Sequence, residues 1–74
     1  MATQLEASTA GTVWQIHVQA GDQVRVGQAL VTLESMKMEV PQEAPCDGVV
    51  SRIAVEAGVL IEEGQSLLEI EPSA

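Results

Sequence analysis

The sequence predicts a small all-β domain built from two similar halves. Residues 11–34 and 48–71 align without a gap when shifted by 37 positions, and ten of the 24 aligned positions are identical. Average composition would give only about one or two matches in an unrelated pair. Val, Ile and Leu recur at alternate positions between closely spaced glycines, which is typical of short strands and tight turns. No window free of Gly and Pro shows a helical periodicity.

Each half contains the same predicted elements in the same order. A strand-like run meets Ala-Gly, a short segment leads to a second Gly, and a second strand follows. The predicted strands are residues 12–18, 29–34, 49–55 and 66–71. Solenoids need at least three repeats to bury a continuous core. Two copies therefore fit better as halves packed around an approximate two-fold axis, in a small sandwich or flattened barrel.

The predicted core is aliphatic. Trp14 is the only aromatic residue, and its simplest interpretation is a core side chain. Ile16 and Ile53 occupy equivalent positions in the two halves, so both are expected to be buried. Simple alternation puts Val13 on the opposite face from Trp14 and Ile16, although Val13 matches Val50 in the other half. A β-bulge near the start of each long strand would reconcile the two patterns.

Composition and charge exclude several classes of protein. Eleven acidic residues against three basic ones give a net charge of −8, so a phosphate backbone would be repelled and nucleic-acid binding is not expected. The same charge favours a soluble monomer. No apolar run approaches the length of a membrane span, and the first six residues lack the features of a signal peptide. A cytoplasmic protein without membrane contact is expected.

Two residues qualify for metal or nucleophile chemistry, and neither is convincing. His17 and Cys46 are 29 positions apart, and the chain contains no second His or Cys. A zinc site needs more ligands than this pair supplies, and a Cys-His pair needs a third, orienting group. The sequence therefore predicts no metal site and no catalytic residue, with His17 on a strand surface and Cys46 in a loop.

The segment between the halves belongs to neither repeat. It contains Lys37, the only lysine of the chain, between Met36 and Met38 in a predicted hairpin at residues 35–40. A two-residue turn at Met36 and Lys37 would require positive φ at both positions. Under the two-fold exchange this hairpin corresponds to the region of the chain termini. The lysine and the termini are therefore expected at opposite ends of the domain.

The inter-repeat segment also carries a family resemblance, which covers almost the whole chain. Residues 34–39 read Glu-Ser-Met-Lys-Met-Glu, and this resembles the biotinyl branch of the biotinyl/lipoyl-attachment family. Further matching segments are Ala20-Gly21-Asp22, Gly27-Gln28, Ala44-Pro45-Cys46-Asp47-Gly48 and Glu63-Gly64-Gln65. The resemblance implies one domain over residues 1–74, formed by two four-stranded antiparallel sheets with the modified lysine on an exposed turn. Ser35 and Val59 depart from the family pattern, but neither change removes the lysine turn.

The same resemblance implies a function. Lys37 is expected to carry covalent biotin, attached by a biotin protein ligase. The domain is then a non-catalytic carrier that shuttles an activated carboxyl group between the biotin carboxylase and carboxyltransferase sites of a biotin-dependent carboxylase. Met36 and Met38 favour biotin over lipoate, because lipoyl domains usually read Asp-Lys-Ala, and we expect a recognition role for them.

Four alternatives stay open at this point. The chain resembles lipoyl carriers as well as biotin carriers, although less closely at the lysine. Adaptors of the membrane-fusion type share the fold, but they lack the lysine turn and usually sit within long helical hairpins. The methionines flanking Lys37 are also compatible with ordinary packing, since methionine fills irregular gaps in a core. The acidic residues Glu34, Glu39 and Glu43 near the lysine are either a solvated face or part of a docking surface.

Overall fold

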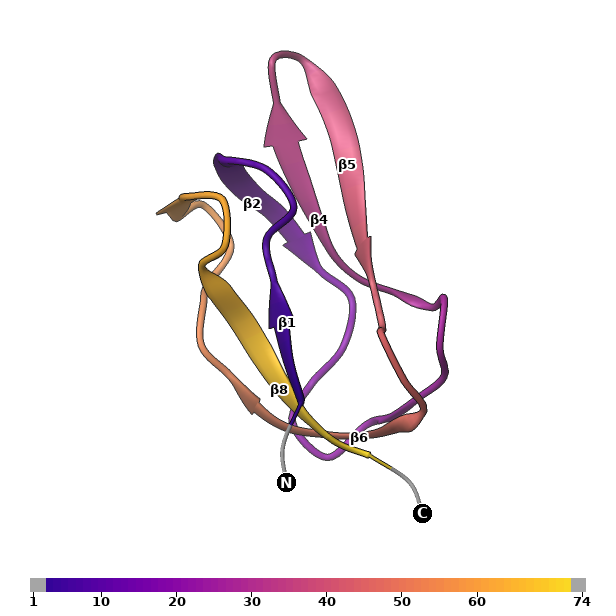
Figure 1. The fold of residues 1–74 in the computed structure, drawn as a ribbon. Coiled ribbons are helices and arrows are strands. Elements are labelled where there is room, and N and C mark those ends of the chain that lie inside the picture. Colours follow the sequence, from indigo (N-terminus) through magenta and orange to yellow (C-terminus); the bar gives the residue numbers. More distant parts are fainter. Residues whose placement is uncertain (1–2, 73–74) are drawn as a thin grey trace.

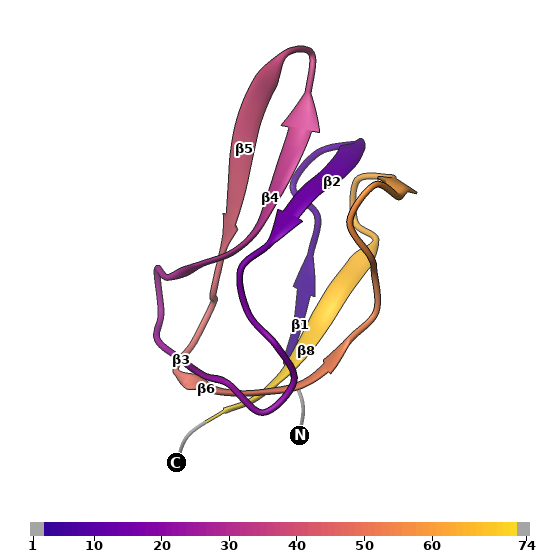
Figure 2. The same ribbon diagram turned by 180° about the vertical axis from the view of Figure 1, so that it is seen from behind.

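The computed structural model describes residues 3–72, whose regular structure consists of eight strands and no helix. The strands are β1 (Thr3–Glu6), β2 (Gly11–Ile16), β3 (Gln23–Val24), β4 (Ala29–Ser35), β5 (Met38–Glu43), β6 (Gly48–Ile53), β7 (Leu60–Ile61) and β8 (Ser66–Pro72). They form two four-stranded antiparallel sheets, which Figures 1 and 2 show from opposite sides. We call β5-β4-β2-β7 the hairpin sheet and β1-β8-β6-β3 the terminal sheet. The expected all-β fold is confirmed.

The internal repeat reappears as a two-fold relation between the sheets. Adding 37 to the bounds of β2, β3 and β4 gives the bounds of β6, β7 and β8. The same operation converts the strand order of the terminal sheet into that of the hairpin sheet. The short strands are exchanged: β3 of the first half completes the terminal sheet, and β7 of the second half completes the hairpin sheet. Each sheet therefore contains strands from both halves.

Reciprocal hydrogen bonds hold the exchanged strands in place. The amide of Gly21 donates to the carbonyl of Val50 at 2.7 Å, and the amide of Gly58 donates to the carbonyl of Val13 at 2.7 Å. The amides of Val13 and Val50 in turn donate, at 2.9 Å, to the carbonyl of the residue that follows each glycine. Both glycines have positive φ, 97° and 92°, which a side chain would disfavour. This conformation turns each chain segment toward the opposite half.

The core follows the same symmetry. Its buried aliphatic side chains are seven pairs related by the 37-residue shift, together with Leu5. The pairs are Ala7/Ala44, Val13/Val50, Val18/Val55, Val24/Ile61, Leu30/Leu67, Val31/Leu68 and Leu33/Ile70. The residue equivalent to Leu5 is Gln42, a buried polar side chain whose Oε1 accepts a hydrogen bond from the amide of Ser8 at 2.9 Å. That bond satisfies the amide oxygen, as burial of a polar group requires.

β-Bulges occur in β2 and β6, where the sequence predicts them. The register of β2 against β4 shifts between Val13 and Gln15, so that Trp14 is the extra residue of β2. An equivalent shift in β6 makes Ser51 its extra residue. Since the extra residue displaces the alternation by one position, inward and outward faces exchange at this point of each strand.

The bulge corrects one expectation about the core. Val13 is fully buried, whereas Trp14 is 50% exposed, so the interpretation of Trp14 as a core residue is wrong. Ile16 and Ile53 are only partly buried and pack against the edge of the core, so the expectation of burial holds in part. Local alternation predicted Trp14 to face inward because it takes no account of an inserted residue.

The lysine-bearing hairpin and the chain ends lie at opposite ends of an elongated molecule. Its principal extents are 37 × 19 × 18 Å. Figure 1 shows the turn between β4 and β5 at the top, while β1 begins and β8 ends at the bottom, as the two-fold predicts. Among residues 3–72 there is no helix long and apolar enough to cross a membrane.

Close approach of strands at two equivalent glycines gives a test of this packing. A Cβ atom at Gly11 would lie 2.6 Å from the carbonyl oxygen of Glu34, and one at Gly48 would collide with the carbonyl of Glu71 and the side chain of Ile70. We expect Gly11→Ala and Gly48→Ala each to destabilise the fold by about 1–3 kcal/mol, as overpacking does. Urea unfolding monitored by circular dichroism measures the change.

The control for the glycine substitutions is Glu56→Ala, an exposed loop position that should change stability by less than about 0.5 kcal/mol. Gly48→Ala should cost more than Gly11→Ala, because its Cβ meets more atoms at shorter range. Unfolding midpoints for both glycine variants that match the control would show that the strands are farther apart than described.

Candidate functional site

The turn between β4 and β5 has the geometry that the sequence predicts. Ser35 and Met38 form the last pair of the β4–β5 ladder, so Met36 and Lys37 make a two-residue turn. Their φ angles are 51° and 67°, both in the left-handed region. Positive φ at both central residues defines a type I′ hairpin turn, whose twist matches that of the flanking strands. The predicted positive-φ turn is confirmed.

The backbone of this turn is strained, because Met36 and Lys37 are not residue types that favour positive φ. Type I′ turns favour Asn-Gly, because other side chains meet steric resistance at positive φ. Met36 and Lys37 are the only residues other than glycine with positive φ in the described chain. The ladder between β4 and β5 runs from the pair Ala29–Glu43 to the pair Ser35–Met38, and its hydrogen bonds hold the turn in this conformation. Strain that the surroundings enforce is common at functional sites.

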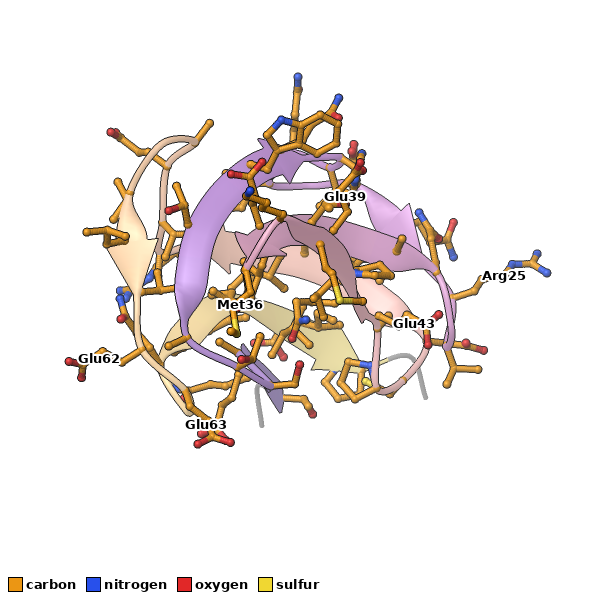
Figure 3. The ribbon with its side chains drawn as sticks, turned by 90° about the horizontal axis from the view of Figure 1, so that it is seen from above. Arg25, Met36, Glu39, Glu43, Glu62 and Glu63 are labelled. Atoms are coloured by element: carbon orange, nitrogen blue, oxygen red, sulfur yellow. The ribbon has the colours of Figure 1, made fainter. Side chains whose placement is uncertain are left out.

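The side chains around the turn are open to solvent. Met36 is 93% exposed and Met38 is 66% exposed, and Lys37 between them is also exposed. Figure 3 looks down onto this end of the domain and shows Met36 there. Exposure to this degree favours a contact role for the two methionines over a role in core packing. Exposed apolar side chains next to a single lysine are instead typical of a contact surface.

Strand alternation explains why Met38 is uncovered. Along β5, Met38 shares its face with Val40 and with the buried Gln42, the face that is turned toward the terminal sheet. The hairpin extends beyond the terminal sheet in Figure 1, so the terminal sheet does not reach this face near the turn, and Met38 is 66% exposed. An apolar side chain on the inner face is thus left available at the tip of the domain.

The hairpin next to the turn carries paired negative charge. Glu34 and Glu39 are direct partners across β4 and β5, one pair away from the turn, and both are exposed. Like charges placed opposite each other destabilise a sheet by a fraction of a kcal/mol. Glu43, also exposed, lies at the far end of β5. The pair thus gives the hairpin an acidic face close to Lys37.

The other two candidate residues, His17 and Cys46, contact neighbouring residues of the fold. The Nε2 atom of His17 lies 2.7 Å from the hydroxyl oxygen of Thr32. Cys46 is partly buried against the core. Residues 3–72 contain no group of three or more His, Cys, Asp or Glu side chains placed to bind a metal ion, and they enclose no pocket. The turn at Lys37 is therefore the candidate site.

Comparison with known proteins gives matches whose names refer to biotin. A family model described as "Biotin-requiring enzyme" matches residues 1–70. The biotin/lipoyl attachment protein of Bacillus subtilis is 59% identical over 32 residues, which cover 43% of this chain and 44% of that protein. Biotinylated protein TB7.3 of Mycobacterium tuberculosis is 44% identical over 41 residues, 55% of this chain and 58% of that protein. The matched segments thus span about half the length of these relatives.

Solved structures share the fold over nearly the whole chain. A single-chain, multi-domain long-chain acyl-CoA carboxylase superposes with a TM-score of 0.92 and 32% identity, covering 97% of this chain and 7% of that one. The urea carboxylase of Kluyveromyces lactis superposes with a TM-score of 0.91 and 28% identity, covering 96% of this chain and 6% of that one. In both, the similar part is a small fraction of a much longer chain.

The strain in the turn makes a prediction about stability. We expect Met36→Asn to stabilise the fold by up to about 1 kcal/mol, because Asn tolerates positive φ and Met36 makes little buried contact. The matched control is Met38→Asn, which places Asn in a strand and should give no gain. Thermal unfolding of the three proteins measures the difference. Equal effects of both substitutions would contradict the strained turn.

Proposed function

The chain belongs to the biotin/lipoyl-attachment family of biotin-requiring enzymes, and from this we propose that it is a biotin carrier with Lys37 as the attachment site. A biotin protein ligase modifies Lys37, and the domain then carries an activated carboxyl group from a biotin carboxylase site to a carboxyltransferase site. The observation that carries the proposal is the only lysine of the chain on a strained, exposed two-residue turn. The biotin-related names of the relatives support it.

The turn suits Lys37 to acylation. Its amine, once neutral, attacks the carbonyl carbon of a ligase-bound biotinyl-adenylate; an amide bond forms, the acyl-phosphate bond breaks, and AMP and a proton leave. A two-residue turn presents the amine beyond both strands, so the ligase meets little steric hindrance. Acylation removes one positive charge, which takes the net charge from −8 to −8 − 1 = −9. Since the lysine is exposed, this loss of charge leaves no buried partner unpaired.

The protein supplies presentation, and its partners supply catalysis. When bound, biotin supplies a ring nitrogen that accepts and releases the carboxyl group. The β4–β5 ladder fixes the direction in which Lys37 points, and the elongated shape separates the lysine from the chain ends. We therefore propose that this domain is a non-catalytic carrier with no catalytic residue of its own. We also propose that it is monomeric, which its net charge of −8 supports, and that it acts in the cytoplasm.

A lipoyl carrier is the second candidate. The name of the Bacillus subtilis relative, biotin/lipoyl attachment protein, is the observation that favours it. Lipoylation would use the same amine and the same turn, so the geometry of Lys37 suits both groups. Met36 and Met38 in place of the usual Asp and Ala favour biotin. The intact mass of the protein purified from its own cells separates the two adducts.

The first test of the proposal is attachment at Lys37. Co-expression with a biotin protein ligase and biotin should add one biotinyl group, read by intact mass and by streptavidin binding. Lys37→Arg keeps the positive charge but should abolish both signals, because the guanidinium is not a nucleophile at neutral pH. The control combines Lys37→Arg with Arg25→Lys, which puts a lysine on a different exposed turn and should stay unlabelled. Labelling of either variant would refute the assignment.

The second test separates recognition from packing at the methionines. Met36→Leu and Met38→Leu conserve volume and polarity, and both side chains are exposed, so the melting temperature should be nearly unchanged. Carboxylation of the fully biotinylated variants by a biotin carboxylase subunit should slow, because a flexible thioether adapts to a partner surface better than a branched chain. Unaltered turnover together with a clear loss of thermal stability would instead assign the methionines to packing.

A further inference from the structure

An exposed apolar cluster lies on the hairpin sheet, away from the lysine turn. It consists of Trp14 in β2, Leu60 in β7 and Val59 just before β7, and we call these residues the Trp14 patch. Trp14 is 50% exposed, Val59 41% and Leu60 77%. Single exposed apolar residues are ordinary on a protein surface, whereas contiguous ones mark contact sites. These three residues can form a contact site only if they are neighbours.

The pairing of β2 with β7 brings them together. Thr12 pairs with Leu60, whose neighbour Ile61 is buried, so the side chain of Leu60 points outward. The carbonyl of Val59 accepts the amide hydrogen of Val13, which places Val59 beside the residue that precedes Trp14. The bulge turns Trp14 outward, two positions along β2 from Thr12. Residues offset by two across adjacent strands lie about 7–8 Å apart, within reach of an indole ring.

The other half of the molecule shows that the fold does not require these apolar residues. Under the 37-residue shift, Trp14 corresponds to Ser51, while Val59 and Leu60 correspond to Asp22 and Gln23. All three equivalents are polar, although the backbone, the bulge and the core are the same in both halves. Polar residues are thus structurally acceptable at these positions. The apolar ones are confined to the sheet that also carries Lys37.

The patch lies close enough to Lys37 for one partner to contact both. Leu60 is opposite Thr12, Thr12 is opposite Glu34, and the lysine turn begins two residues after Glu34. With strands about 4.8 Å apart and a rise of about 3.3 Å per residue, the patch is roughly 10–15 Å from the turn. Glu34 lies on this path, and its partner Glu39 lies beside it on the far side of β4. A protein that takes up the turn can therefore cover the acidic pair and the patch together.

The charges indicate which partner covers this surface. A second copy of the chain would bring another net charge of −8 against the acidic pair, which opposes self-association. The acidic pair instead complements a partner whose contacting surface is basic, and a biotin carboxylase, whose substrates ATP and bicarbonate are both anions, is the partner of the proposed function that best fits this charge. Resting on the function proposed above, we propose that the Trp14 patch is the docking surface for the biotin carboxylase component. The indole occupies an apolar socket whose basic rim faces Glu34 and Glu39.

The chain provides its own variants for testing this surface. Leu60→Gln and Trp14→Ser replace patch residues with their equivalents from the other half, Gln23 and Ser51. Leu60→Gln is the cleaner of the two, because its side chain is the more exposed. Val49→Thr is the matched control: it replaces an exposed apolar residue of the terminal sheet with its equivalent, Thr12. Melting temperatures confirm that each variant is folded before its binding is measured.

The binding measurement uses the only tryptophan as a reporter. Chain labelled with 5-fluorotryptophan gives one fluorine resonance, from Trp14, and is titrated with an unlabelled, purified biotin carboxylase subunit. Lys37→Arg chain is used, so that docking is read without biotin and independently of attachment. The resonance should shift and broaden on titration. Leu60→Gln should raise the Kd at least tenfold, about 1.4 kcal/mol, whereas Val49→Thr should leave it unchanged.

A kinetic measurement on biotinylated carrier completes the test. Trp14→Ser and Leu60→Gln should raise the KM for the carrier in ATP-dependent carboxylation, with little change in kcat and none in the rate of ligation. An undisturbed resonance, or equal Kd values for Leu60→Gln and Val49→Thr, would overturn the proposal. So would a resonance that responds to the ligase instead, or to the concentration of the chain itself. Failure of attachment would appear separately, as Lys37 left unmodified by the ligase.

Discussion

The exchange of short strands between the halves is the constraint on which the rest of the structure depends. Each half has two long strands and one very short one, and the short strand completes the sheet of the other half. The bonds from the Gly21 and Gly58 amides to Val50 and Val13 secure this exchange at the centre of both long strands. One half alone would leave its inner face unburied and a sheet edge unpaired. The two halves therefore form one core, and the paired valines are fully buried in it.

This rigid frame is what allows a strained turn to persist. Strand β4 lies between β5 and β2, so it is hydrogen-bonded on both sides up to the last residues before the turn. The ladder fixes the ends of the turn, and left-handed angles at Met36 and Lys37 are then the way to close it in two residues. Asn-Gly would close the same turn with less strain, but it would present neither an amine nor an apolar side chain. Met36 and Lys37 thus make the fold less stable than Asn-Gly would, but they expose an amine and an apolar side chain.

Much of this architecture was predictable from the sequence, because the duplication is still legible. Aligning the halves predicted β2, β4, β6 and β8 to within two residues at either end, and the spacing around Lys37 predicted the turn. The short strands β3 and β7 were not predicted, since two residues are too few to show a period. Trp14 was assigned to the wrong face because a bulge, which is a property of paired strands, shifts the alternation.

The alignment of the two halves contains part of the signal for the Trp14 patch. The patch could be recognised only with the structure. The aligned halves show that Trp14 is equivalent to Ser51 and that Leu60 is equivalent to Gln23. They become informative only when both positions are known to face outward. The exposure of Met36 and Met38 likewise depends on how far the hairpin extends past the terminal sheet, a tertiary property that no local pattern contains.

The pairing of β1 with β8 has a consequence for how such a domain can be built into larger proteins. Thr3 lies opposite Ile70, so the two ends of the described chain leave the sheet as neighbours, at the pole farthest from Lys37. Domains whose ends are adjacent can be spliced into a loop of another protein as readily as they can be fused at either terminus. Gene fusion therefore need not disturb the hairpin. A fold of this kind can pass as a self-contained module between much longer enzymes, such as the two carboxylases in which the similar part is less than a tenth of the chain.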